Sequence, residues 1–252
     1  MDPTQRFSDR VENYVRHRPS YPPGLIPWLT EAIELSPQSV VADIGSGTGI
    51  SASLFLRNGN PVFAIEPNAA MRAAAEKLLR SFPRFKSVDG TSAATGLPDA
   101  SVDVVTAFQA FHWFDVPAAR KEFARILRPA GWVVLVRNDR RLTGTPFLEA
   151  YEDLLLRLGT DYLRVRHNNV TEEAIRTFLG PGTFKAHTFS NEQRFDFEGL
   201  KGRLVSSSYV PAPDNPGHEP MIRRLMEIFE RFQENGVVTM TYDTRIYTGR
   251  FA

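Results

Sequence analysis

The chain has 252 residues, 42% of them hydrophobic and 23% charged, with a formal net charge of +1. A chain of this length and apolar content can bury a substantial core, which excludes disorder over most of it. Its 30 basic residues barely exceed its 29 acidic ones, so it lacks the basic excess typical of a nucleic-acid-binding protein. Because it contains no cysteine, disulfides, thiolate metal ligands and thiol nucleophiles are excluded as well.

The sequence also indicates a compartment. The N-terminal residues lack the apolar core of a secretory signal, and no apolar run approaches the roughly 18 residues that span a bilayer. We therefore expect a cytoplasmic protein whose partners include neither a membrane nor a nucleic acid. The sequence is compatible with a monomer and with a homodimer.

Two helices are expected ahead of the first strand. Helical patterns at 4–16 and 24–35 are separated by a proline-rich turn at 18–23. Helices in this place have to pack somewhere, and the open rim of the sheet is available. We predict that residues 1–36 form a helical flap.

Residues 37–138 alternate between short β-branched runs and longer amphipathic stretches. This alternation is typical of βαβ units around a parallel sheet. Asn68 and Asp115 stand where helix N-caps are expected. The expected strands are 40–44, 62–66, 85–88, 102–108 and 132–137, and the expected helices are 51–58, 69–82 and 117–127.

Residues 139–252 are expected to complete the sheet. Helical patterns at 146–158 and 172–179 precede two strand patterns at 184–195 and 237–248, which we interpret as an antiparallel pair. A helix at 218–234 lies in the insertion between these strands and is predicted to be part of a lid. The whole chain is thus predicted to be one α/β domain with a Rossmann-like, seven-stranded, mostly parallel sheet. Helices cover both faces, the last strand is antiparallel, and helical flap and lid insertions are added.

A glycine-rich turn follows the first strand of the core. The segment Asp43-Ile-Gly45-Ser-Gly47-Thr-Gly49 turns from a buried strand into a helix, and glycines let the backbone approach a ligand closely. A dinucleotide fingerprint requires a small residue where Ile50 stands, and no Gly-Lys-Ser/Thr exists to bind a nucleoside triphosphate. The turn therefore indicates a different nucleoside ligand.

Glu66 and Gln109 stand at the ends of the second and fourth expected core strands. Ligands of parallel sheets lie outside the carboxyl ends of the strands, where these residues join Gly45. A carboxylate at the position of Glu66 can accept hydrogen bonds from both hydroxyls of a ribose. The three positions together predict a nucleoside site at this edge.

These motifs, with Leu127-Arg-Pro-Ala-Gly-Trp132 and Gln109-Ala-Phe-His112-Trp-Phe-Asp115, resemble the class I S-adenosylmethionine-dependent methyltransferases. The resemblance covers about the first 138 residues and extends to a small-molecule group that includes enzymes like trans-aconitate methyltransferase. It implies S-adenosylmethionine as cofactor, S-adenosylhomocysteine as product and no metal. It also implies that Asp43 orients the turn, that Gly45 and Gly47 face the methionine part, and that Glu66 holds the ribose.

The resemblance implies further cofactor contacts. Gln109 reaches the amino acid portion, while Tyr14 and Arg18 belong to a flap in which Arg18 is a candidate partner for the cofactor carboxylate. The side chains and amides expected around the adenine are those of Pro67, Met71, Thr91, Ser92 and Ala93. Acceptor-side candidates are Tyr21, Arg137, Asn138 and Tyr209, and the basic cluster at 137–141 is either solvated surface or an anion contact.

His112 is the candidate catalytic base because it follows the fourth strand beside the expected methyl site. The alternative is a histidine that forms part of the pocket wall. The histidines and carboxylates show no spacing typical of a metal site.

The sequence thus predicts methyl transfer to a small molecule, at an oxygen of a carboxylate or hydroxyl. Three alternatives remain open: a noncatalytic nucleoside-binding or protein-interaction module, a hydride-transferring Rossmann enzyme and an RNA methyltransferase.

Overall fold

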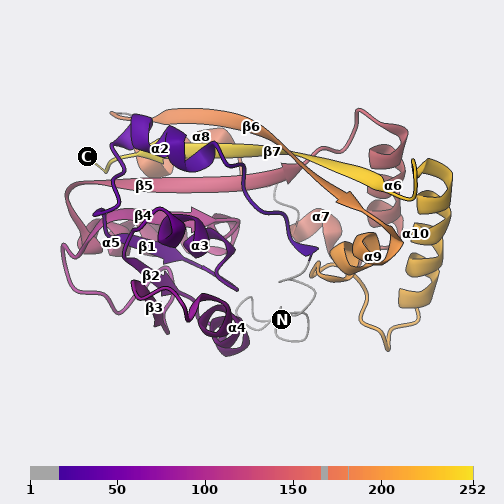
Figure 1. Cartoon of the computed structure of the whole chain (residues 1–252), viewed down its shortest axis with the longest axis horizontal. Coiled ribbons are helices and arrows are strands. Elements are labelled where there is room, and N and C mark those ends of the chain that lie inside the picture. Colours follow the sequence, from indigo (N-terminus) through magenta and orange to yellow (C-terminus); the bar gives the residue numbers. More distant parts are fainter. Residues whose placement is uncertain (1–16, 166–169, 181, 252) are drawn as a thin grey trace.

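One seven-stranded sheet forms the centre of the protein (Figure 1). A computed structural model describes residues 17–165, 170–180 and 182–251. The strand order is β3-β2-β1-β4-β5-β7-β6, parallel from β3 to β5, and β7 is antiparallel to both of its neighbours. The strands are β1 (Val41–Ile44), β2 (Val62–Ile65), β3 (Phe85–Val88), β4 (Val102–Phe108), β5 (Leu127–Arg140), β6 (Lys185–Phe195) and β7 (Val238–Gly249). The predicted mostly parallel sheet with an antiparallel last strand is confirmed.

Strand β5 is longer than the sequence predicts. It runs from Leu127 to Arg140, whereas the apolar pattern indicated only 132–137. Its polar end continues as a strand because it pairs with β7, with Arg137 opposite Arg245 and Arg140 opposite Tyr242. This pairing replaces the apolar signal that a buried strand usually carries.

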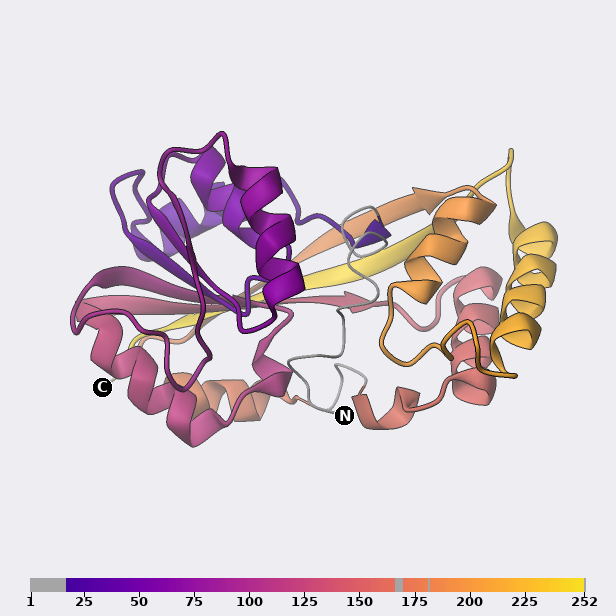
Figure 2. The ribbon, with the colours of Figure 1, turned by 90° about the horizontal axis from the view of Figure 1, so that it is seen from below.

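Helices cover both faces of the sheet (Figure 2). On one face α2, α3 and α4 pack with Val41, Val104 and Val134, and on the other α5 and α8 pack with Ala42 and Val105. Neighbouring strand residues thus alternate between the faces, as the pleat requires. These helices are α2 (Leu25–Ile33), α3 (Ile50–Arg57), α4 (Ala69–Leu79), α5 (Val116–Ile126) and α8 (Glu172–Leu179).

A second group of helices lies at the far end of β5, β6 and β7 (Figure 1). We call it the helical extension: α6 (Pro146–Leu158), α7 (Tyr162–Val165), α9 (Phe197–Val205) and α10 (His218–Phe232). Its apolar residues form their own cluster, in which Leu148, Leu204 and Leu225 are completely buried. The carboxyl ends of β1 to β5 point toward this extension, so the predicted site and the extension face each other (Figure 1).

Both predicted helix caps are confirmed. The Asn68 side chain accepts a hydrogen bond from the Met71 amide at 3.0 Å, at the start of α4. Asp115 accepts one from the Ala118 amide at 3.1 Å, at the start of α5. Each cap satisfies a backbone donor that has no partner inside its helix.

The Asp115→Ala substitution should lower the free energy of unfolding by about 1 kcal/mol, because the N-cap acceptor is lost. Urea denaturation of both proteins measures the difference. Glu76→Ala, at an exposed position in the middle of α4, serves as the control and should change stability by less than about 0.5 kcal/mol. An equal effect of the two substitutions would contradict a capping role.

Candidate cofactor and acceptor site

The glycine-rich turn joins the end of β1 to the start of α3. Gly45 has a φ of 69°, and a Cβ atom there would lie 2.6 Å from the Cβ of Ala110. Gly47 has a φ of 56°, but a Cβ there would meet no heavy atom within 4 Å. Gly45 is therefore required by packing, whereas Gly47 leaves open space beside the backbone. An open, side-chain-free turn is what close approach of a ligand requires.

Asp43 fixes this turn from below. Its carboxylate is fully buried and accepts hydrogen bonds from Ser51 Oγ at 2.6 Å and Thr106 Oγ1 at 2.8 Å. Ser51 lies in the first turn of α3 and Thr106 lies in β4, so one side chain connects three elements. Burial raises the pKa of Asp43 to about 6, although both hydrogen bonds lower it. These contacts support the predicted orienting role.

Glu66 is bonded directly to the turn. Its Oε2 accepts from the Gly47 amide and its Oε1 from the Asn68 amide, each at 2.9 Å. Burial raises the pKa of Glu66, while these two hydrogen bonds oppose the shift. A carboxylate has about four lone-pair sites, so two remain for other donors. That number matches the two hydroxyls of a ribose.

Arg72 organises the backbone around Glu66, a role that the sequence did not indicate. Its Nη1 donates to the carbonyl oxygens of Glu66 and Pro67, each at 2.8 Å, and its Nη2 donates to Asp89 at 2.9 Å. The end of β2 is thereby tied to the end of β3. No local pattern predicts this contact, because the partners lie on separate strands.

The predicted adenine-side residues lie on two segments beside Glu66. Met71 is buried at the start of α4, and Pro67 is half-buried. Thr91 and Ala94 close a tight turn after β3 through backbone hydrogen bonds of 3.0 and 3.3 Å. Within that turn Ser92 is half-buried, and Thr91 and Ala93 are exposed.

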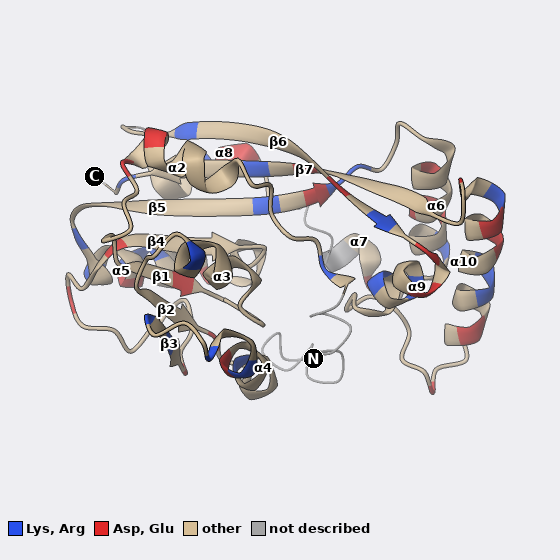
Figure 3. Cartoon of the chain, viewed as in Figure 1, with Lys and Arg blue, Asp and Glu red and all other residues tan. Residues whose placement is uncertain are grey.

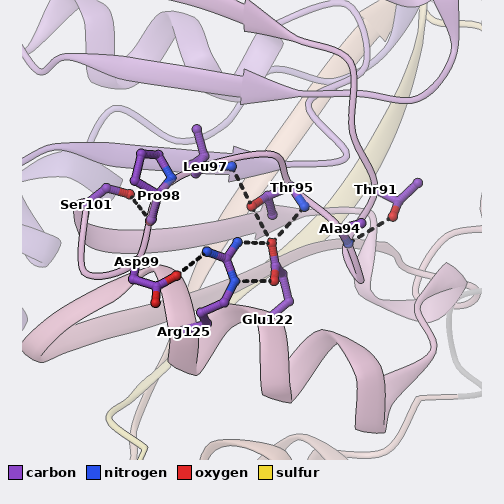
Figure 4. A network of polar contacts seen from close by, with 9 residues as sticks. All are labelled: Thr91, Ala94, Thr95, Leu97, Pro98, Asp99, Ser101, Glu122 and Arg125. Carbon is purple, nitrogen blue, oxygen red and sulfur yellow. Dashed lines mark hydrogen bonds and ion pairs between the residues drawn. The ribbon is translucent and has the colours of Figure 1, made fainter.

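A buried polar network holds this turn against α5 (Figure 4). Glu122 accepts hydrogen bonds from the amide and hydroxyl of Thr95, at 2.8 and 2.6 Å. Arg125 donates to both oxygens of Glu122 and to Asp99. Hydrogen bonds from Arg125 and Thr95 lower the pKa of Glu122 to about 2, against the effect of burial. The segment after β3 therefore depends on the ionised form of Glu122.

Glu122→Gln should destabilise the protein by about 1 to 3 kcal/mol at pH 7, since the charge-assisted bonds to Arg125 and Thr95 are weakened. The contribution of Glu122 is present above its ordinary pKa of 4.5 and is lost as the pH falls toward about 2. The difference in unfolding free energy should therefore shrink in acid. Glu227→Gln, from an exposed pair with Arg224 on α10, is the matched control. A difference that does not change with pH would count against this origin.

A cavity of about 870 Å³, partly open to solvent, lies between the glycine-rich turn and the helical extension. The predicted residues that line it are Arg18, Tyr21, Gly45, Gln109, Asn138 and Tyr209. Residues that sequence reasoning did not assign to the site also line it: Ser46, Thr48, Asp139, Leu142, Tyr162 and Arg203. Arg140, from the basic cluster at 137–141, is a further lining residue. Tyr14 lies outside the described residues.

Gln109 lies at the junction of β4 and β5. It has a φ of 55°, its amide donates to the Val136 carbonyl at 2.9 Å, and its Nε2 donates to the Asn138 carbonyl at 2.9 Å. Within the described part of the chain, three buried oxygens of cavity-lining side chains have no hydrogen-bond partner: Gln109 Oε1, Ser46 Oγ and Thr48 Oγ1. Buried polar atoms are normally satisfied, so these atoms suit a polar ligand.

The opposite wall of the cavity is basic. Basic positions lie at the far end of β5, on α9 and on the segment before α2 (Figure 3). Burial raises the pKa of Tyr209, but the positive charges of Arg203 and Arg140 outweigh it and leave the pKa below its usual value. The wall is therefore strongly electropositive. One local signal existed, because Arg203 lies between the buried Leu200 and Leu204 on the apolar side of α9.

His112 and Arg137 do not line this cavity. They line a small neighbouring space that shares only Gln109 with it. Arg137 forms an ion pair with Asp139 at 2.7 Å and donates to the Val170 carbonyl. Burial lowers the pKa of His112 to about 4, and the charges of Arg137 and Arg18 lower it further. The ring is thus neutral near pH 7 and is a weak base.

An NMR titration should give His112 a pKa near 4, with the resonance assigned by its loss in His112→Gln. A lowered pKa in the folded state means that stability is lost as the pH falls from 6.5 toward 4. Wild type should therefore lose up to about 3 kcal/mol relative to His112→Gln over that range. Titration near pH 6.5 would contradict the buried, neutral ring.

The comparisons with known proteins identify the family. Residues 42–135 match the model of a methyltransferase domain. An uncharacterized methyltransferase-like protein of Schizosaccharomyces pombe is 32% identical over 248 residues, which cover 96% of this chain and 94% of that protein. A second methyltransferase of the same yeast is 28% identical over 227 residues, 89% of this chain and 87% of its own. The chain belongs to the class I S-adenosylmethionine-dependent methyltransferases and is an enzyme of that class.

Solved structures agree on the fold. A candidate type II methyltransferase from Anaeromyxobacter dehalogenans superposes with a TM-score of 0.68 at 24% identity, over 92% of this chain and 97% of that one. The cyclase SpnF superposes with a TM-score of 0.55 at 16% identity, over 98% and 94%. The same fold is thus found in proteins named for different reactions.

Two searches for other kinds of site gave no hit in the described part of the chain. No helix there is long and apolar enough to cross a membrane. No group of three or more histidine, aspartate or glutamate side chains there is arranged to hold a metal ion.

Proposed function

We propose that this methyltransferase acts on a small molecule and methylates an oxygen, either of a carboxylate or of a hydroxyl. The single observation that carries this proposal is the cavity that connects the glycine-rich turn to a wall of arginines and tyrosines. Guanidinium and phenol groups are donors, and they complement acceptors that carry oxygen. The cavity is bounded by the helical extension, which suits a compact ligand better than a polymer.

The residues around the turn fit the cofactor. Glu66 would accept hydrogen bonds from the two ribose hydroxyls through its remaining lone pairs, and Gly45 and Gly47 would border the methionine part. Arg18 and Gln109 would contact its carboxylate and amino group. Pro67, Met71 and the turn 91–93 would border the adenine. When bound, S-adenosylmethionine supplies an electrophilic methyl group on a cationic sulfur.

The chain itself contributes alignment and exclusion of water. Holding an oxygen in line with the methyl group is equivalent to an effective concentration of about 10⁵ M or more. A carboxylate acceptor needs no general base, whereas a hydroxyl profits from one. Of the two roles predicted for His112, we favour the pocket wall, because its pKa is low and it lies behind Gln109 rather than in the cavity.

Calorimetric titration with S-adenosylmethionine and S-adenosylhomocysteine tests the proposed cofactor contacts. Wild type should bind both, and Glu66→Gln should weaken binding by about tenfold to a hundredfold, as expected for hydrogen bonds to a charged group. Glu76→Gln, at an exposed position on α4, should bind like wild type.

Several outcomes would contradict the proposal. Unchanged affinity in Glu66→Gln would remove the ribose role, and preference for NAD would sink the methyltransferase site. Cofactor binding without transfer to any acceptor would favour a noncatalytic module. Transfer to RNA but to no small molecule would favour an RNA methyltransferase.

A further inference from the structure

Arg203 is a buried cation in the wall of the cavity. It lies on α9, and only 7% of its surface is exposed. Its Nη1 donates to Ser207 Oγ at 3.1 Å and its Nε donates to the Tyr242 hydroxyl at 3.4 Å. Among the described residues, no carboxylate forms an ion pair with Arg203, and its Nη2 makes no hydrogen bond. Its charge is therefore held by neutral hydroxyls alone.

The neighbouring arginine is arranged differently. Arg140 also lines the cavity, but it forms an ion pair with Glu152, and the Tyr162 hydroxyl joins the same pair. Its charge is thus already compensated by the protein. Asp139, the carboxylate that lines the cavity, is compensated as well, through its pair with Arg137. The difference isolates Arg203 as the cavity cation that lacks a protein carboxylate.

A guanidinium held in this way favours an anion. Burial of a charge is costly unless a partner of opposite sign is present. A planar guanidinium offers a fork of donors that matches a carboxylate or phosphate, and Nη2 retains its full donor capacity here. The lowered pKa of Tyr209 reports the same positive field in the cavity.

The anion bound there is a poor candidate for the methyl acceptor itself. An oxyanion that shares its lone pairs with a guanidinium is less nucleophilic than a free one, because its charge is already stabilised. Arg203 also belongs to the helical extension, whereas the proposed cofactor contacts lie at the ends of β1, β2 and β4. Anchor and reacting atom are therefore different groups of one molecule.

We propose that the acceptor is a bifunctional small molecule, with one carboxylate or phosphate anchored by Arg203 and a separate oxygen that receives the methyl group. This inference rests on the proposed function and specifies its substrate class. The acceptor oxygen supplies the electron pair of the new O–CH₃ bond while the C–S bond breaks and its pair stays on sulfur. A carboxylate oxygen releases no proton in this step, and a hydroxyl releases one.

The test compares charged and neutral probes on protein saturated with S-adenosylhomocysteine. Calorimetry measures binding of the diacids malonate, succinate and glutarate, of their diamides, and of 3-phosphonopropionate. Wild type should bind at least one of the charged probes at least about tenfold more tightly than the matching diamide, as expected for a charge-assisted pair. Comparison of succinate with 3-phosphonopropionate shows whether the anchor prefers carboxylate or phosphonate.

Arg203→Gln should lose this preference while its affinity for S-adenosylhomocysteine stays within about twofold of wild type. Arg203→Lys retains the charge and should recover part of the preference, and thermal unfolding verifies that both variants are folded. Arg157→Gln is the matched control, because Arg157 is 76% exposed on α6 and pairs with Asp153. The wild-type comparison of acids with amides does not depend on any variant.

Three results would overturn the proposal: equal binding of diacids and diamides, unchanged diacid affinity in folded Arg203→Gln, or no binding of any charged probe. Transfer of labelled methyl groups to neutral acceptors but not to hydroxy acids or diacids would overturn it as well. Failure of S-adenosylhomocysteine to bind would instead contradict the proposed function, so the two failures are distinguishable.

Discussion

The site depends on the buried carboxylate of Asp43. Its hydrogen bonds to Ser51 and Thr106 join the start of α3 and the middle of β4 to the end of β1. The turn between them can therefore remain free of side chains and still have one conformation. From that turn the Gly47 amide donates to Glu66, which brings the end of β2 into the same arrangement. One internal charge thus positions the backbone for the proposed cofactor contacts.

The acceptor side is built by a different device, the antiparallel pairing of β7 between β5 and β6. This pairing keeps the polar residues Arg137 to Arg140 in a strand that extends beyond the end of β4. The helical extension lies at the end of these long strands, and α9 contributes Arg203 to the cavity. A sheet limited to its parallel strands would have a cofactor edge but no second wall.

Chemical specificity consequently resides in the cavity and not in the fold. The fold neighbours include a candidate methyltransferase and a cyclase, which agrees with the general rule that one fold supports many reactions. In this chain the cavity combines partnerless polar oxygens at one end with a guanidinium that lacks a protein counter-ion at the other. The first feature suits a polar cofactor, and the second distinguishes an anionic acceptor from a neutral one.

The sequence by itself determined the sheet, the caps at Asn68 and Asp115, the glycine-rich turn and the strand-end position of Glu66. Each depends on neighbouring residues, whose spacing carries the signal in apolar periodicity, glycine placement or capping chemistry. Only the tertiary structure decided that Arg140, Tyr162 and Arg203 face the turn, that Arg72 ties β2 to β3, and that His112 lies behind Gln109. These contacts join segments far apart in the chain, and the pairing of β5 with β7 that creates the acceptor wall leaves no local pattern in any of them.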